Sequence, residues 1–177
     1  MAEAPTDEFF VALYDELHRL ADRQLRRLGS DLSIGTTTLL HEAYLNMSER
    51  NQRGVPDRSL FLGYAARTMR NIVIDYFRRG VAQKRGNGEF EITLPESLAS
   101  PPGRTEAATE LESLSGALDE LAELDPGLAQ LVDLHFFCGY TFGEIAGFRG
   151  VSERTVQRDW RKARLLLQHA LLDSPNA

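Results

Sequence analysis

The sequence predicts an all-α protein made of two small helical domains that a flexible acidic linker joins. Apolar residues recur at steps of three and four through most of the 177-residue chain, which is the period of amphipathic helices. Glycine, proline and capping residues stand between these periodic stretches, where helices are expected to begin and end. Residues 86–105 lose the period and contain a Pro-Pro pair, as linkers do. We therefore expect one domain at residues 1–85, the linker at 86–105 and a second domain at 106–177.

The first domain is expected to contain three helices. They span about residues 7–28, 38–50 and 58–84. The loop before the third helix, residues 51–57, contains Gly and Pro, and its last residue, Asp57, is a suitable N-cap. Apolar residues nearly surround the third helix in places. Its polar side is basic, because the stretch from Arg67 to Arg85 has six basic residues and one acidic residue.

Basic and aromatic side chains alternate along this third helix. The aromatic positions are Phe61, Tyr64, Tyr76 and Phe77. Single-stranded nucleic acid is often held this way, with aromatic rings stacking on bases and cations following the phosphates. The same spacing also fits a helix whose aromatic residues are core and whose arginines are solvated. The residues alone slightly favour this second interpretation.

The second domain is expected to contain four helices, the last two forming a helix-turn-helix. The first two span about residues 106–124 and 126–138. Asp125 followed by Pro126 marks the start of the second, since an N-cap residue precedes a proline in the first helical turn.

The helix-turn-helix is predicted from its capping residues. Thr141 with Glu144 three residues later fits a capping box that opens a short helix. Glycines at 147 and 150 close that helix, and Ser152 can cap a longer helix that runs to about Leu172. A short helix, a glycine-containing turn and a longer helix favour DNA binding over a plain helical bundle.

The longer helix has an apolar and a basic face. The apolar stripe consists of Val156, Trp160, Ala163 and Leu167. The opposite face carries Arg154, Gln157, Arg158, Arg161, Lys162 and Arg164. Arginine pairs bidentately with guanine and glutamine with adenine in the major groove, so these residue types suit base edges. A solvated basic helix packed on a bundle is the alternative for such a helix taken by itself.

The charge of the chain is unevenly distributed. Its formal net charge is −6. Residues 1–85 carry 13 Lys/Arg against 11 Asp/Glu, residues 86–130 carry 1 against 10, and residues 131–177 carry 6 against 5. Because phosphate contacts supply most non-specific DNA affinity, we expect weak DNA binding by the chain alone. A DNA-binding role therefore predicts a partner that supplies positive surface.

No catalytic or metal-binding pattern stands out, and we expect neither an enzyme nor a cofactor. His41-Glu42 begins like the zinc-protease motif HExxH, but Leu45 occupies the place of the second histidine. His135 and Cys138 lie one helical turn apart without a third ligand nearby, which favours a core thiol and a partly exposed imidazole over a zinc site.

The chain is expected to be cytoplasmic without membrane insertion. No apolar run approaches the roughly 20 residues that a membrane span needs. The acidic N-terminus lacks the basic-then-apolar layout of a signal peptide. A single cysteine excludes an internal disulfide framework and fits a reducing compartment.

Two segments together resemble the sigma-70 family of RNA polymerase sigma factors, of the small extracytoplasmic-function (ECF) type. In the first domain, sigma region 2 is similar to LLHEAYLNM followed by a loop and FLGYAARTMRNIVIDYFRRGVAQKRG. In the second, sigma region 4 is similar to LDELAELDPGLAQLVDLHFFCGYTFGEIAGFRGVSERTVQRDWRKARLLL. The resemblance covers about residues 8–85 and 110–172, in the order and spacing of the family.

The resemblance implies a protein that binds core RNA polymerase at its clamp and flap regions, recognises the −10 and −35 elements of promoter DNA, and promotes DNA melting. The helix implied to dock on the clamp holds Leu40, His41, Glu42, Tyr44 and Leu45. Residues implied in −10 binding and strand separation are Arg67, Arg70, Asn71, Asp75, Arg78 and Arg79. Those implied in −35 recognition are Arg154, Gln157, Arg158, Arg161 and Lys162.

With this resemblance, single-strand binding becomes the better interpretation of the basic and aromatic third helix. The loop at residues 51–57 matches the part that melts the −10 element, and the acidic linker would lie near the RNA exit path of the polymerase.

Two positions of the helix-turn-helix depart from what the resemblance implies. Arg149 stands where the family usually has an aliphatic residue, so we expect Phe148 to fill that pocket while Arg149 extends outward. Asp159 lies within the basic face and is expected to orient a neighbouring cation.

Two other functions are compatible with parts of the sequence. A free-standing helix-turn-helix regulator would bind duplex operator DNA tightly without polymerase. A protein-interaction module, such as an adaptor or sigma-binding decoy, would support no transcription with core enzyme. The sequence leaves open the promoter sequence, the inducing signal and whether an anti-sigma factor binds the chain.

Overall fold

A computed structural model of the chain describes residues 6–28, 34–50, 58–86 and 103–173, and the regular elements within these ranges are all helical. They are α1 (Thr6–Ala12), α2 (Tyr14–Leu28), α3 (Thr36–Arg50), α4 (Arg58–Gly86), α5 (Gly103–Leu124), α6 (Pro126–Val132), a π-helical turn η2 (Asp133–Phe137), α7 (Phe142–Arg149) and α8 (Glu153–Asp173). The all-α prediction is confirmed. The predicted loop at residues 51–57 and residues 87–102 of the predicted linker lie outside the described ranges.

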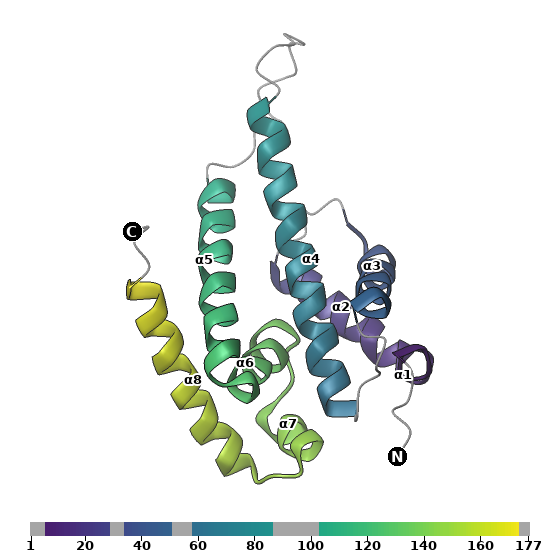
Figure 1. Cartoon of the computed structure of the whole chain (residues 1–177), viewed down its shortest axis with the longest axis vertical. Helices are drawn as coiled ribbons and strands as arrows, with labels where there is room; N and C mark the ends of the chain where they lie inside the picture. Colours follow the sequence, from purple (N-terminus) through teal and green to yellow (C-terminus); the bar gives the residue numbers. More distant parts are fainter. Residues whose placement is uncertain (1–5, 29–33, 51–57, 87–102, 174–177) are drawn as a thin grey trace.

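Helix α4 lies between two groups of helices (Figure 1). On one side it contacts α2 and α3, and on the other α5, α6, η2 and α7. We call α1–α4 the first lobe and α5–α8 the second lobe. Phe61, Leu62, Ala65, Met69 and Val73 of α4 are fully buried, in an apolar core that continues through both lobes. Contact on both sides explains why apolar residues nearly surround this helix.

Two of the expected helices are interrupted. The first is divided into α1 and α2 at Leu13, although the i→i−4 hydrogen bonds of Leu13 and Leu17 persist at 2.9 and 2.8 Å. The helix after Asp125 widens into the turn η2, where the N–H of Cys138 donates to the carbonyl of Asp133 at 3.1 Å. Apolar periodicity alone does not predict either break.

The helix-turn-helix has the capping groups that the sequence predicts. The Thr141 hydroxyl accepts from the N–H of Glu144, and the Glu144 carboxylate accepts from the N–H of Thr141. Helix α7 continues past Gly147 and ends at Gly150, whose φ of 63° is the left-handed conformation that glycine adopts readily. The Ser152 hydroxyl then accepts from the N–H of Thr155 at 3.2 Å and caps α8.

Replacing the cap hydroxyl, Thr141→Ala, is expected to lower the free energy of unfolding by about 1 kcal/mol, because an N–H of the first turn loses its acceptor. Urea denaturation followed by circular dichroism measures this change. Thr38→Ala, at an exposed position of α3, is the control and should change stability by less than about 0.5 kcal/mol. Equal losses in the two variants would contradict the capping contribution.

Candidate nucleic-acid interface

Helix α8 carries a basic stripe that faces solvent. Arg154, Arg158 and Arg161 are exposed, and their spacing of four and three residues places them on one face of the helix. Gln157 belongs to the same face and is half-buried, and its amide donates to a carboxylate oxygen of Glu153 at 3.2 Å. The stripe can therefore approach a DNA groove without rearrangement of the second lobe.

The opposite face of α8 packs on the second lobe. Val156 and Ala163 are fully buried and Leu167 is nearly so, as the periodicity predicts. Trp160 is only half-buried. Its indole meets the imidazole ring of His135 edge-on, with 4.7 Å between ring centroids, and lies 5.9 Å from the ring of Phe142. These aromatic contacts hold α8 against η2 and α7.

Carboxylates accompany two of the basic side chains. Arg158 donates through Nε and Nη2 to Oδ1 of Asp159, at 3.3 and 3.0 Å, so Asp159 orients Arg158. The Nζ atom of Lys162 lies 3.4 Å from Oδ2 of Asp125, the N-cap of α6. Arg158 and Lys162 are both exposed. Such surface pairs contribute little free energy, so both cations can exchange their carboxylate for a phosphate or a base.

The turn region differs from the expectation at Arg149. This side chain does not extend outward: its guanidinium donates to the main-chain oxygen of Gly127 and lies 3.4 Å from Oε1 of Gln130 in α6. Phe148 is half-buried and meets the ring of Tyr140 edge-on at 5.1 Å, as expected for a side chain that fills the pocket. Arg149 therefore links α7 to α6, a tertiary contact that the local sequence does not specify.

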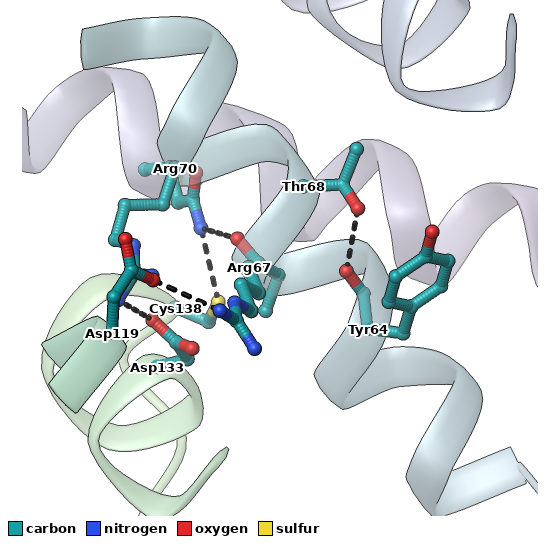
Figure 2. A network of polar contacts seen from close by, with 9 residues as sticks. Tyr64, Arg67, Thr68, Arg70, Asp119, Asp133 and Cys138 are labelled. Atoms are coloured by element: carbon teal, nitrogen blue, oxygen red, sulfur yellow. Dashed lines mark hydrogen bonds and ion pairs between the residues drawn. The ribbon is translucent and has the colours of Figure 1, made fainter. Parts of the chain in front are cut away.

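Arg67 and Arg70 of α4 point toward the second lobe (Figure 2). The Nη2 atom of Arg67 lies 2.9 Å from Oδ1 of Asp119 in α5. Arg70 places Nη1 at 2.9 Å from Oδ1 of Asp133 in η2 and Nη2 at 3.5 Å from the same oxygen of Asp119. The side chains of Arg70 and Asp133 are 1% and 3% exposed, so their ion pair is buried. In this conformation the side chain of Arg70 is enclosed between α4, α5 and η2 and is not accessible from the surface.

The other residues expected at the −10 element lie nearer the surface. Arg78 is exposed and pairs with Glu112 of α5 at 2.9 Å and with Asp75 of α4 at 3.6 Å. Arg79 is exposed, and its guanidinium carbon lies 5.6 Å from the ring centroid of Tyr76.

A polar cleft of about 570 Å³ lies between α4 and α5, beside the ion pairs that join them. Asn71 and Asp75 line it from α4, and Glu112 and Asp119 line it from α5. Acidic side chains of α5 therefore face the polar side of α4 across this cleft. The carboxylates at 112, 119 and 133 were not assigned from the sequence, where acidic residues in helices are normally solvated.

The aromatic residues of α4 are divided between core and surface. Phe61 and Phe77 are buried, and Phe61 stacks on Phe9 with ring centroids 5.3 Å apart. Tyr64 and Tyr76 are partly exposed. The core interpretation therefore holds for the two phenylalanines, and only the tyrosine rings are accessible for stacking on a base.

The residues expected to dock on the polymerase clamp lie on two faces of α3. His41 and Leu45 are exposed, whereas Glu42 and Tyr44 are half-buried. The Glu42 carboxylate accepts from the Tyr76 hydroxyl, and this hydrogen bond raises the pKa of the tyrosine. Leu40 is 2% exposed and belongs to the core, because it follows Leu39 on the inward face of the helix. In this structure Leu40 is therefore a core residue and does not belong to the exposed surface of α3.

An apolar hollow of about 210 Å³ adjoins this surface of α3. Its lining comes from α1, α2 and α3 and consists of Phe10, Val11, Tyr14, Thr37, Leu40, His41 and Tyr44. Val11 and Tyr14 are 78% and 45% exposed, which is unusual for large apolar side chains beside a core. The sequence pattern did not assign these two residues, because single apolar positions on a helix surface carry no signal alone.

Cys138 and His135, the residues weighed as metal ligands, are engaged in packing. Cys138 is fully buried and its Sγ lies 3.6 Å from Nε2 of Gln24, and burial raises the pKa of the thiol. His135 stacks on Phe142 at 4.2 Å. No three His, Cys, Asp or Glu side chains among the described residues are placed to hold a metal ion. Within the same ranges, no helix has the length and apolar character needed to cross a membrane.

The helical fold and the exposed basic stripe on the second helix of a capped helix-turn-helix define a DNA-binding class of protein. The family model described as ECF sigma factor matches residues 2–173. The chain therefore belongs to the ECF sigma factor family, whose members act with RNA polymerase in transcription initiation. Comparison with curated proteins and with solved structures found no match.

Asp133 is expected to make stability fall as pH rises from about 4 to about 6. Burial raises the pKa of Asp133 from 3.8 to about 6, against the attraction of Arg70, so the folded chain holds this proton more tightly than the unfolded chain. Denaturation at several pH values measures the free energy of unfolding of wild type and of Asp133→Asn, which cannot titrate there. The free energy of unfolding of the wild type minus that of the variant should decrease through this range and stay constant above it. A difference that increases with pH would show that the attraction of Arg70 outweighs burial.

Proposed function

We propose that the chain is a promoter-specificity subunit that binds core RNA polymerase, recognises the −35 element with α8 and holds the −10 non-template strand on α4 during strand separation. The exposed basic stripe of α8, in a chain of the ECF sigma factor family, is the observation that carries this proposal. The net charge of −6 supports dependence on a partner, since it opposes binding of the free chain to DNA.

The proposed −35 contacts lie in the N-terminal half of α8, the part of a recognition helix that enters the major groove. They are Arg154, Gln157, Arg158, Arg161 and Lys162. The exposed arginines can each donate two hydrogen bonds to a guanine, and the amide of Gln157 can pair with an adenine. Asp159 pairs with Arg158 at 3.0 Å and leaves its side chain exposed.

The proposed −10 contacts are the polar residues of α4, which are Arg67, Arg70, Asn71, Asp75, Arg78 and Arg79. Exposed Arg78 and Arg79 can follow phosphates, and the amide of Asn71 can pair with an unstacked base. Partly exposed Tyr64 and Tyr76 supply rings on which bases can stack. Arg67 and Arg70 become available when their carboxylate partners in the second lobe move away.

The proposed clamp-binding surface is the exposed side of α3 together with the neighbouring apolar hollow. His41, Tyr44 and Leu45 belong to it, and Val11 and Tyr14 extend it onto α1 and α2. Leu40 supports this surface from the core. Contiguous apolar groups of this kind mark sites of protein contact. We assign contact with the flap region of the polymerase to the second lobe.

Run-off transcription with purified core polymerase and promoter fragments from the same cell tests the proposed function. Addition of the chain should produce promoter-dependent transcripts that core polymerase alone does not make. The proposal would be wrong if the chain bound core polymerase but produced no such transcript on any fragment.

Arg158→Ala is expected to weaken recognition of the −35 element by about 1–3 kcal/mol, because a bidentate base contact is lost. The measurement is the affinity of the assembled holoenzyme for promoter fragments with the intact and the substituted −35 element. Arg26→Ala removes the same charge from an exposed position of α2 and should leave this discrimination unchanged. Equal weakening on both fragments would assign Arg158 to phosphate contact instead.

Leu45→Ala is expected to reduce affinity for core polymerase by about 1–2 kcal/mol, as truncation of a contact residue does. Titration of labelled full-length chain with core enzyme measures this affinity. Leu60→Ala, which alters a leucine of similar exposure in α4 of the first lobe, is the control. A loss no larger than that of the control would remove α3 from the docking surface.

A further inference from the structure

We infer that Asp159 makes Arg158 a reader of a guanine base and not a phosphate contact, and that Arg149 keeps Asp159 in the position where it does so. The inference rests on the proposed recognition of the −35 element by α8. It names the base that this part of α8 reads. It also gives a positioning role to two residues that do not themselves contact DNA.

The pair of Arg158 and Asp159 uses one edge of the guanidinium group. The Nε and Nη2 atoms of Arg158 both donate to Oδ1 of Asp159, at 3.3 and 3.0 Å. A guanidinium group holds its five N–H donors in one rigid plane, so Asp159 leaves the end formed by Nη1 and the second N–H of Nη2. The Arg158 side chain is 74% exposed, and this end can therefore meet a ligand without rearrangement of the pair.

Two parallel N–H donors match guanine among the four bases. In the major groove guanine presents O6 and N7 as neighbouring acceptors, whereas the edges of adenine and cytosine contain an amino donor and thymine offers one oxygen. A solvated arginine exchanges among many rotamers, and fixing it on binding costs entropy. Because Asp159 already holds the guanidinium group, Arg158 loses less entropy when it contacts a guanine.

The net charge of the pair favours a base over a phosphate. Arg158 and Asp159 together are neutral, and Asp159 repels a phosphate at the place where Arg158 attracts it. A guanine base carries no charge, so its hydrogen bonds with the free end of Arg158 are much less affected. The ion pairs that α8 makes within the described ranges are those of Arg158 and Lys162. Arg154 and Arg161, both exposed, thus keep a full charge that suits the DNA backbone.

Asp159 is in turn held on the side of α8 that faces α6. Its side chain is 25% exposed, and it lies close to Arg149: burial lowers the pKa of Arg149, and the carboxylate of Asp159 opposes that shift. The guanidinium group of Arg149 is fixed by its hydrogen bond to the main-chain oxygen of Gly127. Lys162, one turn later in α8, pairs with the N-cap residue of α6 at 3.4 Å on this same side. Attraction by Arg149 therefore keeps Asp159 where Arg158 reaches it.

The affinity of the assembled holoenzyme for modified promoter fragments tests the inference. Each guanine of the −35 element is replaced in turn by 7-deazaguanine, which lacks the N7 acceptor and still pairs with cytosine. At one guanine the replacement should weaken binding of the wild type about three- to tenfold, as loss of a hydrogen bond does. Arg158→Ala should be insensitive to the replacement at that guanine, because its contact is already absent.

Asp159→Ala should change affinity and base preference in opposite directions. It should bind the unmodified fragment about two- to fivefold more tightly and with a steeper salt dependence, because Arg158 can then pair with a phosphate. Its loss on the 7-deazaguanine fragment should fall below about twofold. Asp159→Asn keeps an acceptor oxygen without the charge, so it should bind more tightly as well but retain most of the sensitivity to 7-deazaguanine.

Two further variants control for charge and for the role of Arg149. Glu120→Gln removes a charge from an exposed position of α5 and should leave the sensitivity to 7-deazaguanine at the wild-type level. Arg149→Leu should reduce this sensitivity in the wild-type chain but not further in the Asp159→Ala chain, because it acts through Asp159. Arg149→Lys keeps the charge and should restore part of the sensitivity. Circular dichroism checks the folding of each variant.

The outcomes separate this inference from the proposed function. Full sensitivity to 7-deazaguanine in Asp159→Ala would overturn the inference, even if the wild type directs promoter-dependent transcription. A wild type that is insensitive at every guanine would overturn it in the same way. Equal losses from Arg149→Leu in the wild-type and Asp159→Ala chains would remove the role of Arg149. A wild type that neither distinguishes −35 elements nor produces promoter-dependent transcripts would remove the proposed function and, with it, the inference.

Discussion

The buried ion pair of Arg70 and Asp133 determines how the two lobes meet. Neither charge can remain in the core alone, because an unpaired buried ion costs several kcal/mol, so α4 and η2 must face each other at this point. Asp119 lies between this pair and Arg67, and it connects the buried charges to the surface. The pair therefore specifies the arrangement of the lobes, while the apolar core supplies most of the stabilising free energy.

Helix α4 must pack between the two lobes and, in the proposed function, must also bind the −10 strand. Its apolar residues are buried by helices on both sides, whereas its polar residues are the ones proposed to hold the −10 strand. In this structure most of these polar residues line the polar cleft that lies between α4 and α5. The basic stripe of α8 remains exposed in the same arrangement. Duplex recognition by α8 is thus compatible with the packing of the two lobes, whereas contact of Arg70 with a DNA strand requires movement of the second lobe.

The sequence predicts the local features of this fold well. Thr141, Glu144 and Ser152 specify their helix starts through short-range hydrogen bonds, and the α8 stripe follows from helical periodicity. Contacts between distant segments could not be derived in this way. Arg70 has the same helical phase and residue type as a solvated arginine, and only the position of η2 makes it a buried ion-pair partner. Arg149 likewise requires knowledge of where α6 lies.

One signal for the contact between the lobes was present in the sequence. Apolar residues that nearly surround a helix indicate burial on more than one side, and three helices of a single lobe cannot cover α4 completely. The partners of Arg67 and Arg70 remained unidentified because acidic side chains on helices are usually solvated. Leu40 shows the same limit, since its place in a motif did not distinguish a surface contact from a core residue.

A distance between the lobes tests the central claim most directly. Spin labels at Glu49→Cys in α3 and Gln168→Cys in α8 occupy exposed positions, whereas the native Cys138 is buried. Pulsed electron paramagnetic resonance should give one narrow distance in the free chain and a clearly longer distance in the complex with core polymerase and promoter DNA. The same distance in both states would contradict the account, because the promoter strand would then bind without separation of the lobes.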